Sequence, residues 1–109
     1  MLNFRIMAFS LLMVGLAGCA SPGSPTASKL TRKAPADYAA CVLPKWQALA
    51  PQATQKSISN GYRLTAPSAV ASDNVLEVVK SQDGSRATFY KGSFLSSDKL
   101  RMAARECLD

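Results

Sequence analysis

Cysteine is the side chain in this sequence with the widest range of chemistry. The 109 residues include three cysteines and no histidine. Without an imidazole, Ser-His and Cys-His nucleophilic catalysis and most zinc or haem sites lack a usual component. The cysteines also lack the C-x-x-C spacing that tunes a thiol pKa for redox chemistry. The cysteine and histidine counts therefore disfavour the common hydrolases and metalloenzymes.

The acidic residues show no catalytic spacing either. The seven carboxylates are scattered along the chain, at Asp37, Asp73, Glu77, Asp83, Asp98, Glu106 and Asp109. The sequence contains no G-x-x-x-x-G-K-[ST] phosphate loop, no G-x-S-x-G nucleophile elbow and no H-E-x-x-H helix. We therefore predict a protein that is not an enzyme, with no catalytic residue, no metal site and no cofactor.

The N-terminal segment is typical of an export signal. A short polar and basic start, with Asn3 and Arg5, precedes an apolar run from Ile6 to Leu16 that only a serine and a glycine interrupt. This run of about eleven residues is shorter than the about 20 that a membrane-spanning helix needs. The segment is therefore expected to be removed rather than to remain as a transmembrane anchor.

The leader ends in Leu16-Ala17-Gly18-Cys19, which resembles the lipobox of bacterial lipoproteins. The resemblance implies cleavage before Cys19, a diacylglycerol on its sulfur and an acylated amine, an anchor far stronger than one acyl chain. Ala20 and Ser21 follow with no aspartate, which implies the outer membrane of a Gram-negative cell, facing the periplasm. In a Gram-positive cell the same anchor would lie on the outer face of the plasma membrane. The alternative is an ordinary signal peptide that leaves Cys19 as a free thiol.

Residues 20–34 are rich in serine, proline and threonine and cannot bury much apolar surface. We therefore predict a signal peptide over residues 1–18, a lipidated cysteine with a flexible tether over 19–35, and a small globular domain over 36–109. Lys29, Arg32 and Lys33 are either solvated linker charges or contacts to lipid headgroups, worth roughly 1 kcal/mol each on an anionic leaflet.

Cys41 and Cys107 lie near the two ends of the predicted domain. A domain of this size has a thin core and is expected to need a covalent staple. In the oxidising compartment that the export signal indicates, these two cysteines predict a disulfide.

A helix is predicted from Pro35. Its larger side chains recur at near-helical spacing, at Tyr38, Cys41, Val42, Trp46 and Leu49. Pro44 should end or kink this helix, so we expect one bent helix or two short turns. Trp46 is interpreted as a core anchor, with a ligand-stacking surface residue as the alternative.

The middle of the chain, residues 51–91, has the alternating pattern of strands and hairpins. Asn60-Gly61 is predicted to join strands 54–59 and 62–66, and Asp83-Gly84 to join strands 75–81 and 85–91. Ala87 and Phe89 should face either Leu76 and Val78 or Val75 and Val79. Strand alternation places Phe89 and Tyr90 on opposite faces.

The C-terminal segment predicts the clearest helix. Ser96 and Ser97 are candidate N-caps, Asp98 suits the first turn, and one face is apolar. The residues of this face are Leu100, Ala103, Ala104 and Cys107. The predicted fold class is α+β: a four-stranded antiparallel sheet of two hairpins flanked by N- and C-terminal helices, in the order α-β-β-β-β-α, with the helices joined by a disulfide.

Positive charge indicates the candidate binding surface, because 13 Lys and Arg against 7 Asp and Glu give a net charge of +6. Arg101 and Arg105 lie one helical turn apart with Lys99 nearby. They either form a solvated face or join Arg86 or Lys91 in a cationic patch for lipid headgroups, an acidic partner or an anionic glycan. Tyr90 is the aromatic residue that we add to this possible binding surface.

The whole chain is similar to small envelope lipoproteins of proteobacteria, which combine a lipobox, a low-complexity tether and a cysteine-stapled domain. The shared pattern runs from Cys41 to Trp46, then through Gly61-Tyr62 and Tyr90 to Cys107. The resemblance implies no particular activity and no binding residues. We predict a lipid-anchored, non-enzymatic module that binds another envelope protein, for example as an inhibitor or immunity protein. The alternative is a basic module that contacts lipid or cell wall, whereas nucleic acid is disfavoured by the export signal.

Overall fold

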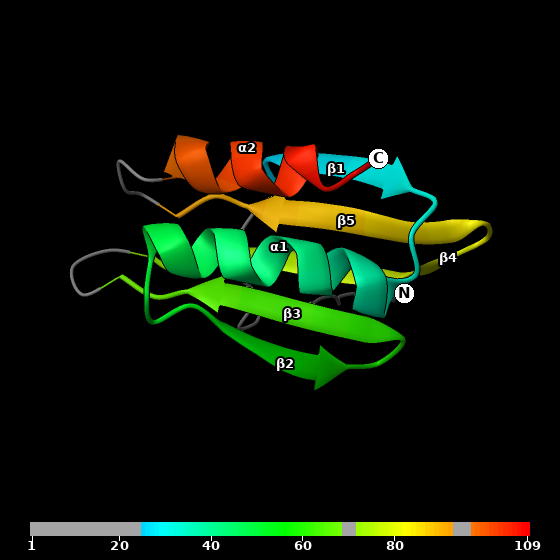
Figure 1. Cartoon of the computed structure of the whole chain (residues 1–109), viewed down its shortest axis with the longest axis horizontal. Helices are drawn as coiled ribbons and strands as arrows, with labels where there is room; N and C mark the ends of the chain where they lie inside the picture. The colour runs from blue at the N-terminus through cyan, green and yellow to red at the C-terminus, as the bar shows by residue number, and fades with distance from the viewer. Residues whose placement is uncertain (1–24, 69–71, 93–96) are drawn as a thin grey trace, which may run out of the picture.

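Two helices pack on one face of a five-stranded antiparallel sheet (Figure 1). The computed structural model describes residues 25–68, 72–92 and 97–109. The sheet has the strand order β1-β5-β4-β3-β2. The elements are β1 (Ala27–Thr31), α1 (Pro35–Leu49), β2 (Thr54–Ile58), β3 (Gly61–Ala66), β4 (Asn74–Ser81), β5 (Gly84–Tyr90) and α2 (Ser97–Glu106). The predicted α+β class is confirmed.

Both predicted hairpins are present, with each turn one residue earlier than predicted: Ser59 and Asn60 connect β2 to β3, and Gln82 and Asp83 connect β4 to β5. Asn60 has a φ of 64°, in the left-handed region that asparagine tolerates better than most residues. A Cβ at Gly61 would overlap the carbonyl oxygen of Val78, so this close approach of two strands requires glycine. In the second hairpin Leu76 lies opposite Phe89 and Val78 opposite Ala87, which is the first of the two predicted registers.

The structure adds an edge strand in a segment that the sequence analysis assigned to the tether. β1 pairs antiparallel with β5, with Ala27 opposite Phe89 and Thr31 opposite Ser85. The prediction of four strands is therefore wrong by one, and the element order is β-α-β-β-β-β-α. The strand forms because β5 would otherwise present a free row of backbone donors and acceptors, and pairing with β1 satisfies that row.

Helix α1 runs through Pro44 as one element, so the alternative of two short turns is wrong. Pro44 has no N–H, and the carbonyl of Ala40 therefore lacks its usual intrahelical donor. Both residues are exposed, so water can bond that carbonyl. The opposite side of α1 is buried and holds the helix on the sheet, through Tyr38, Ala39, Val42 and Trp46.

The aromatic residues of α1 hold α2 by hydrogen bonds as well as by packing. Trp46 is fully buried, its ring packs edge-on against Phe89 at 6.2 Å, and its Nε1 donates to the Leu100 carbonyl at 2.9 Å. The Tyr38 hydroxyl donates to the Ala104 carbonyl at 2.7 Å, and burial raises the pKa of this hydroxyl far above its usual value. Trp46 is therefore a core anchor, as predicted.

The predicted disulfide between Cys41 and Cys107 joins α1 to α2, with a Cα–Cα distance of 5.9 Å. The predicted apolar face of α2 is buried, from Leu100 to Cys107. With 10 residues, α2 is shorter than the roughly 12–15 that an isolated helix needs to be even marginally stable in water. Its stability therefore comes from contacts with the rest of the domain.

Replacing Cys107 with serine should lower the free energy of unfolding by about 4 kcal/mol, because the disulfide closes a loop with a sequence separation of 66 residues. Denaturant unfolding of the oxidised protein measures this difference, with Cys19→Ser as the control that leaves the disulfide intact. Equal stabilities of Cys107→Ser and the parent would show that the disulfide does not stabilise the fold.

Candidate functional site

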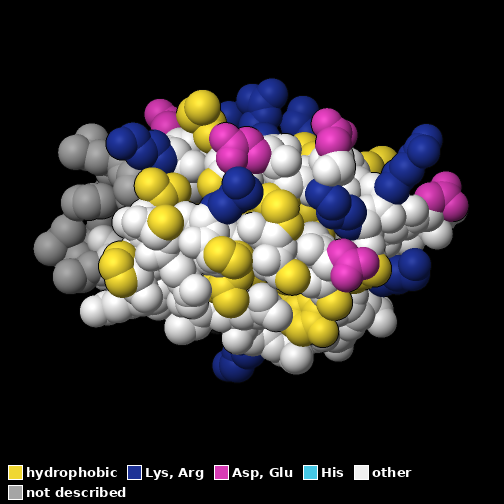
Figure 2. Space-filling model, viewed as in Figure 1, with side chains coloured by type: hydrophobic (Ala, Val, Ile, Leu, Met, Phe, Trp, Pro, Cys, Tyr) yellow, Lys and Arg dark blue, Asp and Glu magenta, His cyan; other side chains and the backbone are white. Residues whose placement is uncertain are grey.

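The two arginines of the predicted surface lie beside a lysine from the edge strand. Arg101 and Arg105 of α2 line a shallow slot together with Lys29 of β1. The floor of this slot is apolar and includes Ala87, Phe89 and Ala104. Figure 2 shows Lys and Arg side chains, in dark blue, gathered along the upper edge of the molecule, over α2 and β1. We call Lys29, Arg101 and Arg105 the basic ridge.

Most of the positive charge on the basic ridge is available to a partner. Arg101 forms an ion pair with Asp98 at 3.5 Å, but the Asp98 side chain is 71% exposed, so water screens this pair strongly. Lys29 and Arg105 are exposed, and the described part of the chain offers neither of them an ion-pair partner. The ridge can therefore attract an external anion.

The other residues of the predicted surface lie elsewhere. Lys99 is two helical turns from Glu106, which pairs with Lys45 of α1 at 3.4 Å, so Lys99 lies on the flank of α2 that faces α1. Tyr90 lies opposite Val75, on the sheet face away from the helices, and Arg86 lies on that same face. The predicted cluster of Arg101, Arg105, Lys99 and Tyr90 is thus split among three surfaces.

The sequence predicts Lys29 as a linker charge or a contact to lipid headgroups, but it does not group Lys29 with the arginines of α2. Only the pairing of β1 with β5 places Lys29 opposite Ala87 and next to α2. The sequence indicates this strand only weakly, through the alternation of residues 27–31. Ser28 and Leu30 lie on one face of β1, and the other three residues lie on the face toward the helices.

The sheet face away from the helices forms a second candidate surface, which we call the open face. No helix or strand among the described residues covers it (Figure 1). Its central row is polar and mutually bonded: Arg63 contacts Glu77 at 2.7 Å and 2.8 Å, and the hydroxyls of Ser28 and Thr88 lie 3.3 Å apart. Beside this row, Val75 is 7% exposed and lies next to Tyr90. The open face therefore combines a row of bonded polar side chains with one half-buried aromatic residue, Tyr90.

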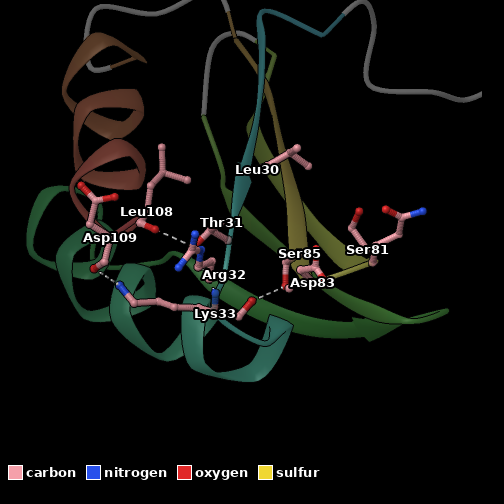
Figure 3. A pocket seen from close by; sticks show the side chains of 11 residues that line it. Leu30, Thr31, Arg32, Lys33, Ser81, Asp83, Ser85, Leu108 and Asp109 are labelled. Atoms are coloured by element: carbon pink, nitrogen blue, oxygen red, sulfur yellow. Dashed lines mark hydrogen bonds between the residues drawn. The ribbon is translucent and has the colours of Figure 1, made fainter.

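A larger cleft of about 610 Å³ lies between the end of β1, the β4–β5 turn and the last residues of the chain (Figure 3). Several of its polar groups are already used within the protein. Thr31 Oγ1 donates to the Leu108 carbonyl at 2.6 Å, and Ser85 Oγ donates to the Lys33 carbonyl at 2.7 Å. Lys33 Nζ donates to the carbonyls of Cys107 and Asp109. The polar groups of the cleft therefore mainly hold the end of β1 against the end of α2.

Ser85 is the buried serine that lies in this cleft. Ser85 in the cleft donates to a backbone carbonyl, so its hydroxyl does not face a base in this arrangement. Within residues 25–68, 72–92 and 97–109, no three histidine, cysteine or acidic residues come together in a way that could hold a metal ion. None of the helices in these ranges is long and apolar enough to span a bilayer. Cys19, the predicted lipidation site, lies outside the described residues.

Comparison of the chain with protein-family models, with curated proteins and with solved structures gave no match. The candidate surfaces therefore rest on the sequence and the geometry of this chain alone.

Replacing Lys33 with methionine should lower the free energy of unfolding by about 2 kcal/mol, because the carbonyls of Cys107 and Asp109 lose a charged donor. Arg32→Met is the matched control. Arg32 is an exposed neighbour in the same cleft, and its side chain makes no hydrogen bond or ion pair to the described residues. Thermal or denaturant unfolding compares the two variants. A loss as large in Arg32→Met would indicate a general effect of charge, not of these two bonds.

Proposed function

We propose that this chain is a lipid-anchored protein of the cell envelope whose small domain binds another envelope protein and catalyses no reaction. The anchor is Cys19 at the end of the lipobox, and the proposed location is the periplasmic side of a Gram-negative outer membrane. The observation that carries the binding role is the open face, which no described helix or strand covers.

The chemistry of the open face favours a protein partner. Tyr90 and Arg86 lie on this face, and tyrosine and arginine are enriched among the residues that dominate binding energy in protein interfaces. Val75 is buried beside Tyr90 and supports its ring, while the Arg63–Glu77 and Ser28–Thr88 contacts hold the polar row of this face in place before binding. The face is thus pre-organised for docking.

The charge of the open face favours an acidic partner. Lys56, Arg63 and Arg86 lie on it, against the single carboxylate of Glu77 among the described residues of this face. Complementary charge increases the rate of association and disfavours basic partners. An inhibitor or immunity protein that covers an acidic surface of an envelope toxin or cell-wall enzyme is one form of this function.

The lipid anchor is tested by the intact mass of the protein extracted from membranes. We expect a chain that begins at Cys19 and carries the mass of the attached acyl groups. Cys19→Ser should shift the protein to the soluble fraction. A chain that begins at another residue without added mass would contradict the anchor.

The protein-binding role is tested by site-specific cross-linking in living cells. A photoreactive amino acid in place of Thr88, in the middle of the open face, should yield one discrete adduct with an envelope protein. The same amino acid in place of Met102, which is 55% exposed on α2, is the matched control and should not yield that adduct.

Adding Tyr90→Ala to the Thr88 probe should reduce the yield of the adduct at least tenfold, the effect of about 1.4 kcal/mol at an interface. The Thr88 probe in the Cys19→Ser background tests whether the partner is met only at the membrane. Adducts of equal yield from positions 88 and 102, or none from position 88, would contradict binding through the open face.

A second candidate function, a module that contacts lipid or cell wall, is favoured by one specific observation. Lys29 and Arg105 are cations without a recorded ion-pair partner among the described residues, and they lie on an edge distinct from the open face. The two functions are compatible, because they use different surfaces of the same domain.

A further inference from the structure

We infer that the basic ridge is the part of the domain that faces the membrane, where Lys29, Arg101 and Arg105 contact the phosphates of anionic lipid headgroups. This inference rests on the proposed lipid anchor at Cys19, and it adds the orientation in which the anchored domain is held. Three independent features of the chain carry it: the length of the tether, the place where the tether joins the fold, and the charge found there.

The tether is short because β1 begins early. Only six residues separate Cys19 from Thr26, whose backbone N–H donates to the Phe89 carbonyl at 2.7 Å. The seven residue-to-residue steps from Cys19 to Thr26 span at most about 25 Å when fully extended. A tether of this length cannot let the domain turn freely far from the bilayer, so one side of the domain must stay close to the lipid surface.

The tether joins the fold on the side that carries the basic ridge. It enters at the start of β1, which is an edge strand of the sheet and lies beside α2 (Figure 1). Lys29 is the third residue of β1. Arg101 and Arg105 line the same slot as Ala27 and Lys29. The edge nearest the anchor is thus the edge over which Figure 2 shows the gathered cations.

The shape of the slot limits the contact to headgroups. Between the three cations the slot holds only about 20 Å³, close to the space of one water molecule, above the apolar floor. An acyl chain does not fit there. The long side chains of Lys29 and Arg105 can instead lie along the apolar rim and direct their charged ends outward, toward phosphates at the surface of the leaflet.

In this orientation the two candidate surfaces do not compete. The basic ridge lies at the β1 edge, whereas the open face lies on the side of the sheet away from the helices. With the β1 edge toward the bilayer, the sheet stands upright, so that the open face and β2 at the far edge remain accessible to a protein partner. The basic ridge therefore sets the orientation of the domain, and the open face binds the protein partner.

The orientation is tested on the acylated protein in lipid nanodiscs that contain spin-labelled headgroups. In an equal mixture of phosphatidylglycerol and phosphatidylcholine, paramagnetic broadening should be strongest at the amides of β1 and of Arg105, and weak at those of β2. In phosphatidylcholine alone this difference should shrink. The strongest broadening at β2, or equal broadening at both edges of the sheet, would overturn the inference.

The charge contribution is tested with unacylated Cys19→Ser protein and vesicles of the same two compositions, by co-sedimentation. The double variant Lys29→Glu, Arg105→Glu should bind the phosphatidylglycerol vesicles at least about thirtyfold less than its parent, since two cations contribute about 1 kcal/mol each. The double variant Lys56→Glu, Lys80→Glu makes the same change in net charge at exposed positions away from the ridge and should retain most of the binding.

Equal losses in the two double variants would show that only net charge matters, and no preference of the parent for phosphatidylglycerol would show that the ridge does not contact lipid. Either result overturns the inference. Because this measurement uses protein without acyl chains and without a partner, it is independent of the intact mass and of the cross-linking. A missing lipid anchor or a missing protein partner is therefore distinguishable from an inactive ridge.

Discussion

The covalent bond between Cys41 and Cys107 holds α2 in a place that ten residues of helix could not keep alone. On the side of α1, the Tyr38 hydroxyl and the Trp46 indole donate to carbonyls of α2 and orient the same contact. The buried polar groups of both aromatics are thereby satisfied, which allows them to remain in the core. Every surface that α2 contributes, including the arginines of the basic ridge, depends on this attachment to α1.

The same attachment explains why β1 belongs to the domain. The end of α2 reaches the end of β1, where the Thr31 hydroxyl and the Lys33 ammonium group bond carbonyls of the last three residues. Ser85 of β5 bonds the Lys33 carbonyl from the other side. The strand is therefore held by backbone pairing along its length and by side chains at its end. A segment with few apolar side chains becomes part of the fold in this way, and the tether to the proposed anchor shortens accordingly.

Much of this fold could be predicted from local signals. Asn60-Gly61 and Asp83-Gly84 indicate both hairpins to within one residue, and the apolar spacing from Leu100 to Cys107 indicates α2. β1 could not be predicted in this way, because Leu30, its only large apolar residue, is 62% exposed and points away from the core. For the candidate site, the helical spacing of Arg101 and Arg105 placed them together, but Lys29 joins them only through the missed strand. Tyr90 does not join them, because its pairing with Val75 places it on the other face of the sheet.

Residues 27–31 form a strand and thereby bring Lys29 and the start of the tether to the same edge as α2. Amide hydrogen exchange of the acylated, full-length protein measures the protection of this strand. We predict that amides of β1 bonded to β5 exchange orders of magnitude more slowly than those of an unstructured peptide, as the central strands do. Exchange of all the β1 amides at the free-peptide rate, while β4 and β5 remain protected, would contradict it. The segment would then be a tether, and the basic ridge would lose Lys29 and its position next to the anchor.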